Sequence, residues 1–158
     1  MKRVAIFIFF AVTMATSALS QSIYNPKADA KAEIQKAVTK ASAEGKHVLI
    51  QIGGNWCPWC IKLHNFFDTN IDIKKTIDKN YVFILVNYSK ENKNNEIMKQ
   101  LEFPNRFGYP VLVVLDGKGK RIHTQATDLL EQDKSYSNEK VLRFLNLWNP
   151  AAINPANY

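Results

Sequence analysis

The sequence predicts an α/β protein in which a central mixed β-sheet is flanked by helices. Short runs of apolar and β-branched residues alternate along the chain with segments whose apolar residues recur at the helical period. Strands joined by helices favour parallel neighbours through right-handed crossovers. A glycine-containing turn between the last two predicted strands favours an antiparallel hairpin instead. The expected order is therefore helix, strand, helix, strand, helix, strand, strand, helix.

The first half of the predicted domain places one strand between helices. Alanine, isoleucine and valine recur at helical spacing in the first helix, which Gly45 ends. Asparagine and aspartate side chains can cap the third helix. The expected bounds are 27–44 for the first helix, 46–52 for the strand, Cys57 to about Phe67 for the second helix, and Asn70 or Asp72 to Lys79 for the third.

The second half contributes three more strands. Residues 81–87 are an almost continuous apolar run, which is typical of a central strand buried on both faces. The turn at 116–119 contains two glycines and predicts a hairpin to an edge strand. Pro104 ends a short helix, because the residue before a proline avoids helical geometry. The expected bounds are 81–87, 111–115 and 120–125 for the strands, and 95–102 and 138–148 for the helices.

The N-terminus reads as a secretory signal peptide. Lys2 and Arg3 precede an apolar run to about Met14, and Ala18-Leu19-Ser20 supplies small residues before a cut after Ser20. The alternative, an uncleaved anchor, is disfavoured because a membrane span needs ~20 apolar residues. We therefore expect export to the periplasm or another extracytoplasmic compartment. The predicted units are a signal peptide at 1–20, one domain at 21–150 and a flexible tail at 151–158.

The chain is basic, with a formal net charge of +7. Its lysines are spread along the whole sequence, mostly where helical patterns place a solvated face. Nucleic-acid binding would need a clustered basic stripe, so we expect no nucleic-acid partner. The charge serves solubility, with a mild preference for acidic partner surfaces.

The two cysteines are the most informative residues, because they lie three apart as Cys57 and Cys60. The pair follows a predicted strand and opens a predicted helix, where backbone N–H groups and the helix dipole favour a thiolate. A purely structural disulfide in an exported domain would join more distant segments. The spacing and position therefore indicate a redox or nucleophilic site.

The chain resembles the thioredoxin-fold thiol–disulfide oxidoreductases over roughly residues 27–148. Within that superfamily it is most similar to exported thioredoxin-like proteins with a WCxWC motif and to the C-terminal domains of membrane disulfide reductases. The matching features are Trp56-Cys57-Pro58-Trp59-Cys60 after the first strand, the apolar strand 81–87, Gly108-Tyr109-Pro110 before 111–115, and the hairpin Asp116-Gly117-Lys118-Gly119 with a closing helix.

Two departures from the family pattern leave the direction of electron flow open. Classical thioredoxins have a buried aspartate six residues before the first cysteine, whereas this chain has Gln51, which cannot titrate. The dipeptide between the cysteines is Pro58-Trp59 rather than Gly-Pro. Glutaredoxins have a proline and an aromatic residue there, but we recognise no other part of a glutathione site.

The resemblance implies a role for each motif residue. Cys57 is the attacking thiolate, and Cys60 resolves the mixed disulfide. Pro58 stiffens the first helical turn and lacks an N–H. Pro110 is expected in the cis form, which exposes the backbone of Tyr109 to an extended substrate.

The aromatic residues around the motif have two interpretations. Trp56 and Trp59 either form an apolar platform for substrate or pack in the core. Tyr109 is either a wall beside the sulfurs or a specific contact. Together with Pro58 and Pro110, these residues are the predicted substrate-binding set.

The histidines give weaker signals. His64 could join Cys57 and Cys60 on a metal, but a structural zinc site needs four protein ligands and no fourth lies nearby. His47 and His123 fit strand ends or the surface. We therefore expect no metal and no cofactor beyond the redox-active disulfide.

We therefore expect an exported enzyme that exchanges its dithiol with protein thiols or disulfides. We expect it to act as a reductase and to be a monomer. One small domain without a dimerisation extension resembles reductants more than isomerases. A membrane electron donor or acceptor is an expected partner. The open alternatives are a disulfide-donating oxidant, a non-catalytic peptide-binding module and a metal or haem chaperone.

Overall fold

The computed structural model describes residues 22–158, so the predicted signal peptide at 1–20 lies outside the described residues. Its centre is a four-stranded mixed sheet with the order β2-β1-β3-β4. β1 runs parallel to β2 and antiparallel to β3, and β3 is antiparallel to β4. The strands are β1 (His47–Gly53), β2 (Tyr81–Asn87), β3 (Val111–Leu115) and β4 (Arg121–Ala126).

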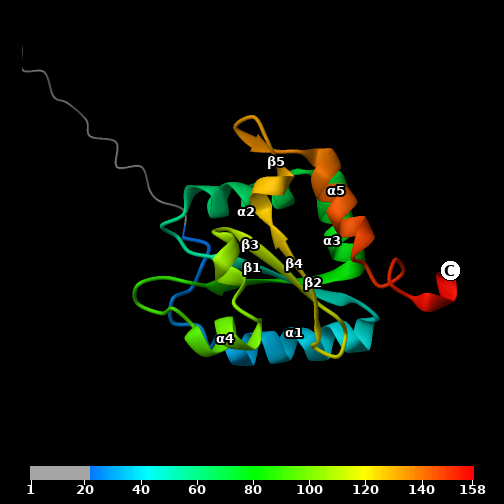
Figure 1. Cartoon of the computed structure of the whole chain (residues 1–158), viewed down its shortest axis with the longest axis horizontal. Helices are drawn as coiled ribbons and strands as arrows, with labels where there is room; N and C mark the ends of the chain where they lie inside the picture. Colours follow the sequence, from blue (N-terminus) through cyan, green and yellow to red (C-terminus); the bar gives the residue numbers. More distant parts are fainter. Residues whose placement is uncertain (1–21) are drawn as a thin grey trace, which may run out of the picture.

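Helices cover both faces of the sheet (Figure 1). One layer holds α1 (Ala30–Glu44) and the short α4 (Asn95–Gln100). The other layer holds α2 (Pro58–Thr69), α3 (Ile71–Asn80) and α5 (Asn138–Leu147). The α/β class and the helix-flanked mixed sheet predicted from the sequence are thus confirmed.

The sheet divides the hydrophobic core in two. Successive side chains of a strand point to opposite faces, so Val113 packs with α1 while Leu112 and Val114 pack with α2, α3 and α5. All five residues of β3 are buried. The central strands β1 and β3 therefore hold the two layers of helices together.

Capping residues explain where the helices begin and end. The first helix starts at Ala30 rather than at residue 27, because the Asp29 carboxylate accepts a hydrogen bond from the Ala32 N–H and forms the N-cap. Gly45 ends that helix, as predicted, and it adopts the left-handed conformation. The Asn70 side chain caps α3 by accepting from the Ile73 N–H, and its backbone N–H closes α2.

The prediction that residues 81–87 form a central strand is wrong. β2 is an edge strand, and among residues 22–158 no strand pairs with its outer side. Its four middle residues are only partly buried. The apolar run arises because both layers of helices cover this strand: Val82 and Ile84 pack against the core under α1, and Phe83 packs against the opposite core.

Several short elements were not expected from the sequence. A short hairpin follows β4, and each of its strands has two residues: β5 (Glu131–Gln132) and β6 (Ser135–Tyr136). The 3-10 helices are η1 (Pro104–Phe107), η2 (Thr127–Leu130) and η3 (Pro155–Asn157). These segments are too short to show a hydrophobic period.

The C-terminal segment turns back on itself. The Tyr158 hydroxyl donates to the Ala152 carbonyl at 2.7 Å, and the Asn157 amide donates to the Ala151 carbonyl. The flexibility expected for residues 151–158 stays a prediction. Among the described residues, no helix is both long and apolar enough to cross a membrane.

Two histidines fasten the end of α5 to the sheet. His47 opens β1, as expected for a strand end, and its Nδ1–H donates to the Trp148 carbonyl at 2.8 Å. His123 lies within β4 and is half-buried, and its ring stacks on Trp148 with centroids 4.0 Å apart. Burial lowers the pKa of His123, and the positive charge of Arg121 lowers it further.

This lowered pKa predicts a pH dependence of stability. The folded state binds the His123 proton less tightly than the unfolded state does, so His123 stabilises the fold above about pH 6.5 and this contribution is lost as the pH falls. We expect the melting temperature to drop less between about pH 7.5 and about pH 5.5 in His123→Phe than in the unchanged chain. Phenylalanine keeps the ring over Trp148 but cannot titrate. Equal drops in the two proteins would contradict the assignment.

Candidate active site

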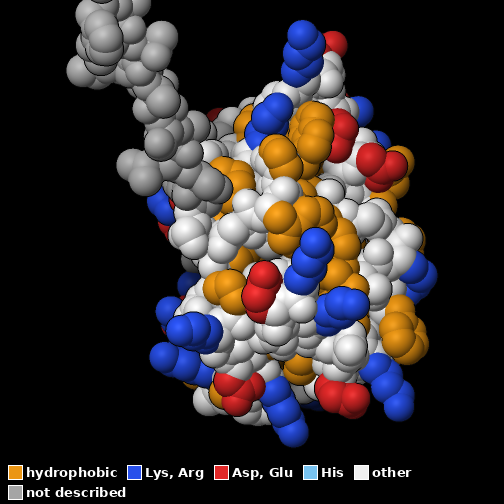
Figure 2. All heavy atoms as spheres, turned by 90° about the vertical axis from the view of Figure 1, so that its left-hand side faces the viewer, with side chains coloured by type: hydrophobic (Ala, Val, Ile, Leu, Met, Phe, Trp, Pro, Cys, Tyr) orange, Lys and Arg blue, Asp and Glu red, His pale blue; other side chains and the backbone are white. Residues whose placement is uncertain are grey.

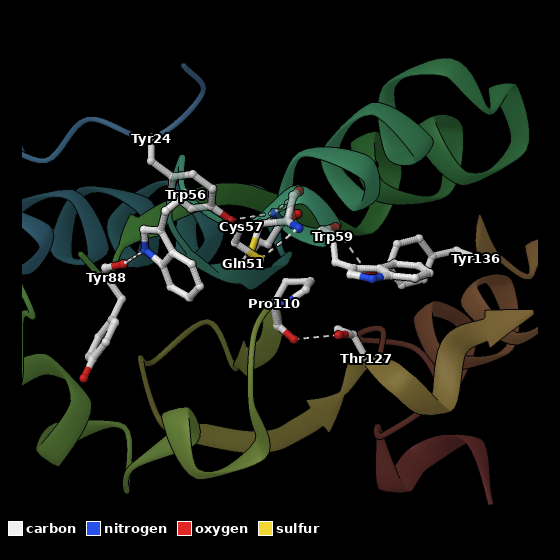
Figure 3. The surroundings of a disulfide bond; sticks show 10 residues. Tyr24, Gln51, Trp56, Cys57, Trp59, Tyr88, Pro110, Thr127 and Tyr136 are labelled. Carbon is white, nitrogen blue, oxygen red and sulfur yellow. Dashed lines mark hydrogen bonds between the residues drawn. A yellow bond between two sulfur atoms is a disulfide. The ribbon is translucent and has the colours of Figure 1, made fainter. Parts of the chain in front are cut away.

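The two cysteines form a disulfide where β1 gives way to α2, as the sequence predicts (Figure 3). Cys57 is the N-cap of α2, and its sulfur accepts a hydrogen bond from the Cys60 N–H at 3.2 Å. Pro58 occupies the first turn and has no N–H to offer the sulfur. The Cα atoms of the two cysteines are 5.2 Å apart.

Cys57 is less accessible than its place in the motif suggests. It is 4% exposed and Cys60 is 0% exposed, so both sulfurs are shielded from solvent in the oxidised state. The reason is local packing: Trp59 and Tyr109 lie against the small buried cluster that the cysteines form with Tyr24. These aromatic side chains therefore limit access to the Cys57 sulfur.

Trp56 lies on the surface beside the disulfide. It is 56% exposed, which excludes the core-packing interpretation. Its indole N–H donates to the Tyr88 carbonyl at 2.7 Å, and its ring meets the Tyr109 ring edge-on at 5.5 Å. Tyr88 and Tyr109 are stacked at 4.9 Å. The indole is therefore held in one orientation although it faces solvent.

Trp59 is partly buried on the other side of the motif. Its ring meets Tyr136 edge-on at 5.5 Å, and the Lys62 ammonium lies 4.3 Å from the ring centre. The Tyr136 hydroxyl donates to the Trp59 carbonyl at 3.3 Å. The short β5-β6 hairpin thus supplies one wall of the site through Tyr136, which no sequence pattern had pointed to.

The proline loop lies next to the disulfide, as Figure 3 shows. The Tyr109–Pro110 peptide bond is cis, which confirms the expectation from the family resemblance. The Pro110 carbonyl accepts a hydrogen bond from the Thr127 hydroxyl at 2.5 Å. Thr127, which was not predicted, therefore ties this loop to η2.

A buried polar pair lies behind the cysteines. Gln51 is 0% exposed, and its Nε2 group donates to the Tyr24 hydroxyl at 2.7 Å and to the Cys60 carbonyl at 2.9 Å. Burial raises the pKa of Tyr24 far above its ordinary value. Gln51 is thus a buried polar residue at the position where classical thioredoxins have an aspartate, whereas Tyr24 carried no recognisable signal in the sequence.

A groove opens beside Trp56, with a volume of about 540 Å³. Figure 2 looks onto this side of the molecule and shows hydrophobic side chains gathered in the middle, with lysines and arginines around them. The groove combines aromatic surface with two lysines and one glutamate. Its lining residues are Trp56, Tyr88, Ser89, Lys90, Glu91 and Lys93.

His64 does not join the cysteines. Its Nε2 atom lies 3.3 Å from an Asp68 carboxylate oxygen, and its ring stacks on Phe83. Within residues 22–158, no group of three or more His, Cys, Asp and Glu side chains is placed to hold a metal ion. The expectation that the protein carries no resident metal or cofactor stays a prediction.

Gly53 is required by the close packing of β1 on α2. A Cβ atom at this position would stand 2.4 Å from the Cys60 sulfur and 2.8 Å from the Tyr24 hydroxyl, so even alanine does not fit. We expect Gly53→Ala to lower the free energy of unfolding of the oxidised protein by about 1–3 kcal/mol, measured in urea.

Gly117→Ala is the matched control for this prediction. A Cβ atom on Gly117 would meet nothing closer than 3.4 Å, which is ordinary contact. That variant should change the free energy of unfolding by less than about 0.5 kcal/mol. If the two alanine variants lose the same stability, the close approach of Gly53 to the Cys60 sulfur is not the reason that position 53 needs glycine.

Comparison with solved structures shows the same fold. A disulphide isomerase from Xylella fastidiosa Temecula1 matches with a TM-score of 0.70 and 24% identity, over 80% of this chain and 95% of that one. A protein described as DsbH oxidoreductase matches with a TM-score of 0.54 and 20% identity, over 71% and 78%. A thioredoxin from Thermus thermophilus matches with a TM-score of 0.50 and 18% identity, over 71% and 80%.

The sequence comparisons identify the family. Comparison with curated protein sequences gives no significant match. The family model described as thioredoxin-like matches residues 29–117, a segment that includes β1, the disulfide, the cis-proline and β3. The chain therefore belongs to the thioredoxin-like family.

Proposed function

We propose that this protein is an exported thiol–disulfide oxidoreductase that reduces disulfides in other proteins. The observation that carries the proposal is the Cys57–Cys60 disulfide at the N-terminus of α2, under a rim of aromatic side chains. A helix N-terminus stabilises a thiolate, and a thiolate is the reactive form in disulfide exchange.

The proposed reaction uses both sulfurs in turn. The Cys57 thiolate attacks one sulfur of a substrate disulfide, forms a mixed disulfide and releases the other substrate sulfur, which takes a proton from water. The Cys60 thiolate then attacks the Cys57 sulfur and expels the second substrate thiolate. The substrate gains two electrons, and the cysteine pair loses two as its disulfide closes.

The small number of hydrogen-bond donors near the Cys57 sulfur supports the reductive direction. Pro58 removes one N–H from the first turn of α2. The nearest lysine along the helix, Lys62, donates to the Lys134 carbonyl instead. Strong oxidants of this kind have a stabilised reduced form. A less stabilised Cys57 thiolate therefore favours a lower reduction potential and a reducing role.

The surroundings of the disulfide suit protein substrates. Trp56 offers exposed aromatic surface, and the backbone beside Pro110 lies within the same site. Trp56, Pro58, Trp59, Tyr109 and Pro110 are the proposed substrate-binding residues. Lys90 and Lys93 border the adjoining groove and favour acidic residues near the substrate cysteine.

Export and the partner that returns electrons complete the proposal. The signal-peptide pattern at 1–20 supports an extracytoplasmic location, where a reductase needs a supply of electrons across the membrane. We propose a membrane dithiol protein as that donor, with this protein acting as a monomer.

Single cysteine variants test the exchange reaction. With a protein disulfide such as insulin as substrate, Cys57→Ser should abolish exchange, because the attacking sulfur is lost. Cys60→Ser should instead accumulate a covalent complex with the substrate, visible on a non-reducing gel, because the resolving sulfur is lost.

These two variants form a matched pair, since each removes one sulfur from the same disulfide. A non-catalytic peptide-binding module would hold its ligand equally well with Cys57→Ser. Substrate turnover that survives in both variants would refute the proposal.

The reduction potential tests the direction separately. The protein is equilibrated against glutathione or dithiothreitol buffers, and its free thiols are labelled and counted. We expect a value near that of thioredoxin, about −270 mV, because the Cys57 thiolate has few donors. A value near about −120 mV would make the protein an oxidant and would overturn the reductive direction while leaving the exchange reaction intact.

A further inference from the structure

Tyr24 reaches the active site from outside the sheet and is held there by Asn55. The Asn55 side-chain oxygen accepts hydrogen bonds from the Ile23 and Tyr24 N–H groups, both at 2.9 Å. Its amide group donates to the Tyr24 carbonyl at 2.8 Å and to the Ser22 hydroxyl at 3.1 Å. Asn55 precedes Cys57 by two residues, so the loop before the disulfide fixes the position of Tyr24.

The hydrogen bonds of Gln51 determine which way the Tyr24 hydroxyl points. The Cys60 carbonyl can only accept, so the Gln51 atom that faces it must be the amide nitrogen. The same nitrogen contacts the Tyr24 oxygen, which therefore accepts this bond. The hydroxyl hydrogen of Tyr24 is not used in that contact and is free to be donated to another group.

The Cys60 sulfur is the neighbouring group that can receive this hydrogen. Tyr24, Cys57 and Cys60 form one buried cluster. A single point, the place where a Cβ of Gly53 would lie, is 2.4 Å from the Cys60 sulfur and 2.8 Å from the Tyr24 oxygen. The two atoms thus share one small space over the Gly53 backbone.

We propose that Tyr24, held by Asn55 and oriented by Gln51, donates its hydroxyl hydrogen to the Cys60 sulfur whenever the disulfide is open. This inference rests on the proposed exchange function and adds a residue to it. In the oxidised protein the Cys60 sulfur is a weak acceptor. After the disulfide opens the sulfur becomes a thiolate, and hydrogen bonds to charged groups are the stronger ones.

The hydrogen bond acts on the resolving step. Cys60 loses its proton to solvent, and its thiolate attacks the Cys57 sulfur of the mixed disulfide. A new Cys57–Cys60 bond forms as the bond from Cys57 to the substrate breaks, and the substrate sulfur leaves with the electron pair. Tyr24 keeps its own proton throughout, and the same bond stabilises Cys60 as a leaving thiolate in the reverse direction.

Burial keeps Tyr24 in the state that this role needs. The pKa of Tyr24 is raised far above its ordinary value, so the hydroxyl remains protonated at physiological pH. Gln51 has no charge to lose. Tyr24, oriented by Gln51, therefore donates a hydrogen bond to the buried Cys60 sulfur. Neither residue takes up the proton that the Cys60 thiol loses.

Tyr24→Phe tests the inference with a chromogenic aromatic disulfide, dithiobis-nitrobenzoate, mixed in equal amount with the reduced protein. Attack by Cys57 releases the first coloured thiolate, and resolution by Cys60 releases the second. We expect the first release to be unchanged and the second to slow by about tenfold, the scale of one hydrogen bond to a charged group. The pH profile of the second release should shift to higher pH.

Tyr81→Phe is the matched control. Tyr81 is a buried tyrosine at the start of β2, the end of that strand far from the disulfide. Its hydroxyl donates to the Leu145 carbonyl at 2.6 Å. Its loss costs a buried hydrogen bond of similar kind but should leave both releases unchanged. Asn55→Ala should slow the second release as Tyr24→Phe does, because Tyr24 is no longer held.

The outcomes separate the two proposals. If the unchanged protein releases two thiolates and Tyr24→Phe releases the second at the same rate and with the same pH profile, the role of Tyr24 is refuted and the exchange function stands. If the unchanged reduced protein releases no second thiolate, the exchange function itself fails. Slowing of the same size in Tyr81→Phe would show a loss of stability rather than a specific bond, and would also refute the inference.

Discussion

The contact between the Cys60 sulfur and the backbone of Gly53 is the constraint on which the site depends. The last residue of β1 has to lack a side chain so that α2 can start directly against the sheet. This close packing buries the inner sulfur completely and leaves Cys57 as the N-cap. The Tyr24 hydroxyl lies in the same small space, 2.8 Å from the point where a Gly53 Cβ would stand.

The topology of the sheet brings the other parts of the site to the same edge. Gly53 pairs with Asn87 on the parallel strand β2, and Ile52 pairs with Val111 on the antiparallel strand β3. The ends of β1 and β2 therefore meet the beginning of β3. As a consequence, the disulfide, Tyr88 and the cis-proline lie together although they are far apart in the chain.

Features encoded by neighbouring residues could be predicted, and features built from distant contacts could not. The spacing of Cys57 and Cys60 and the proline before β3 are local signals, and both the disulfide and the cis bond are confirmed. Tyr24 enters the site through long-range hydrogen bonds to Asn55 and Gln51, which no local pattern records. The apolar pattern of residues 81–87 reflects cover by helices on both faces, which edge and central strands can share. For this reason the pattern wrongly predicted a central position for this strand.

The placement of the three tryptophans divides the intrinsic fluorescence of the protein into two signals. Trp56 and Trp59 are each the immediate neighbour of a cysteine, so their emission is exposed to quenching by the disulfide and to its relief on reduction. Trp148 lies after α5, stacked on His123, and senses that imidazole instead. We therefore expect emission from this protein to combine a readout of the oxidation state with a separate readout of acidity.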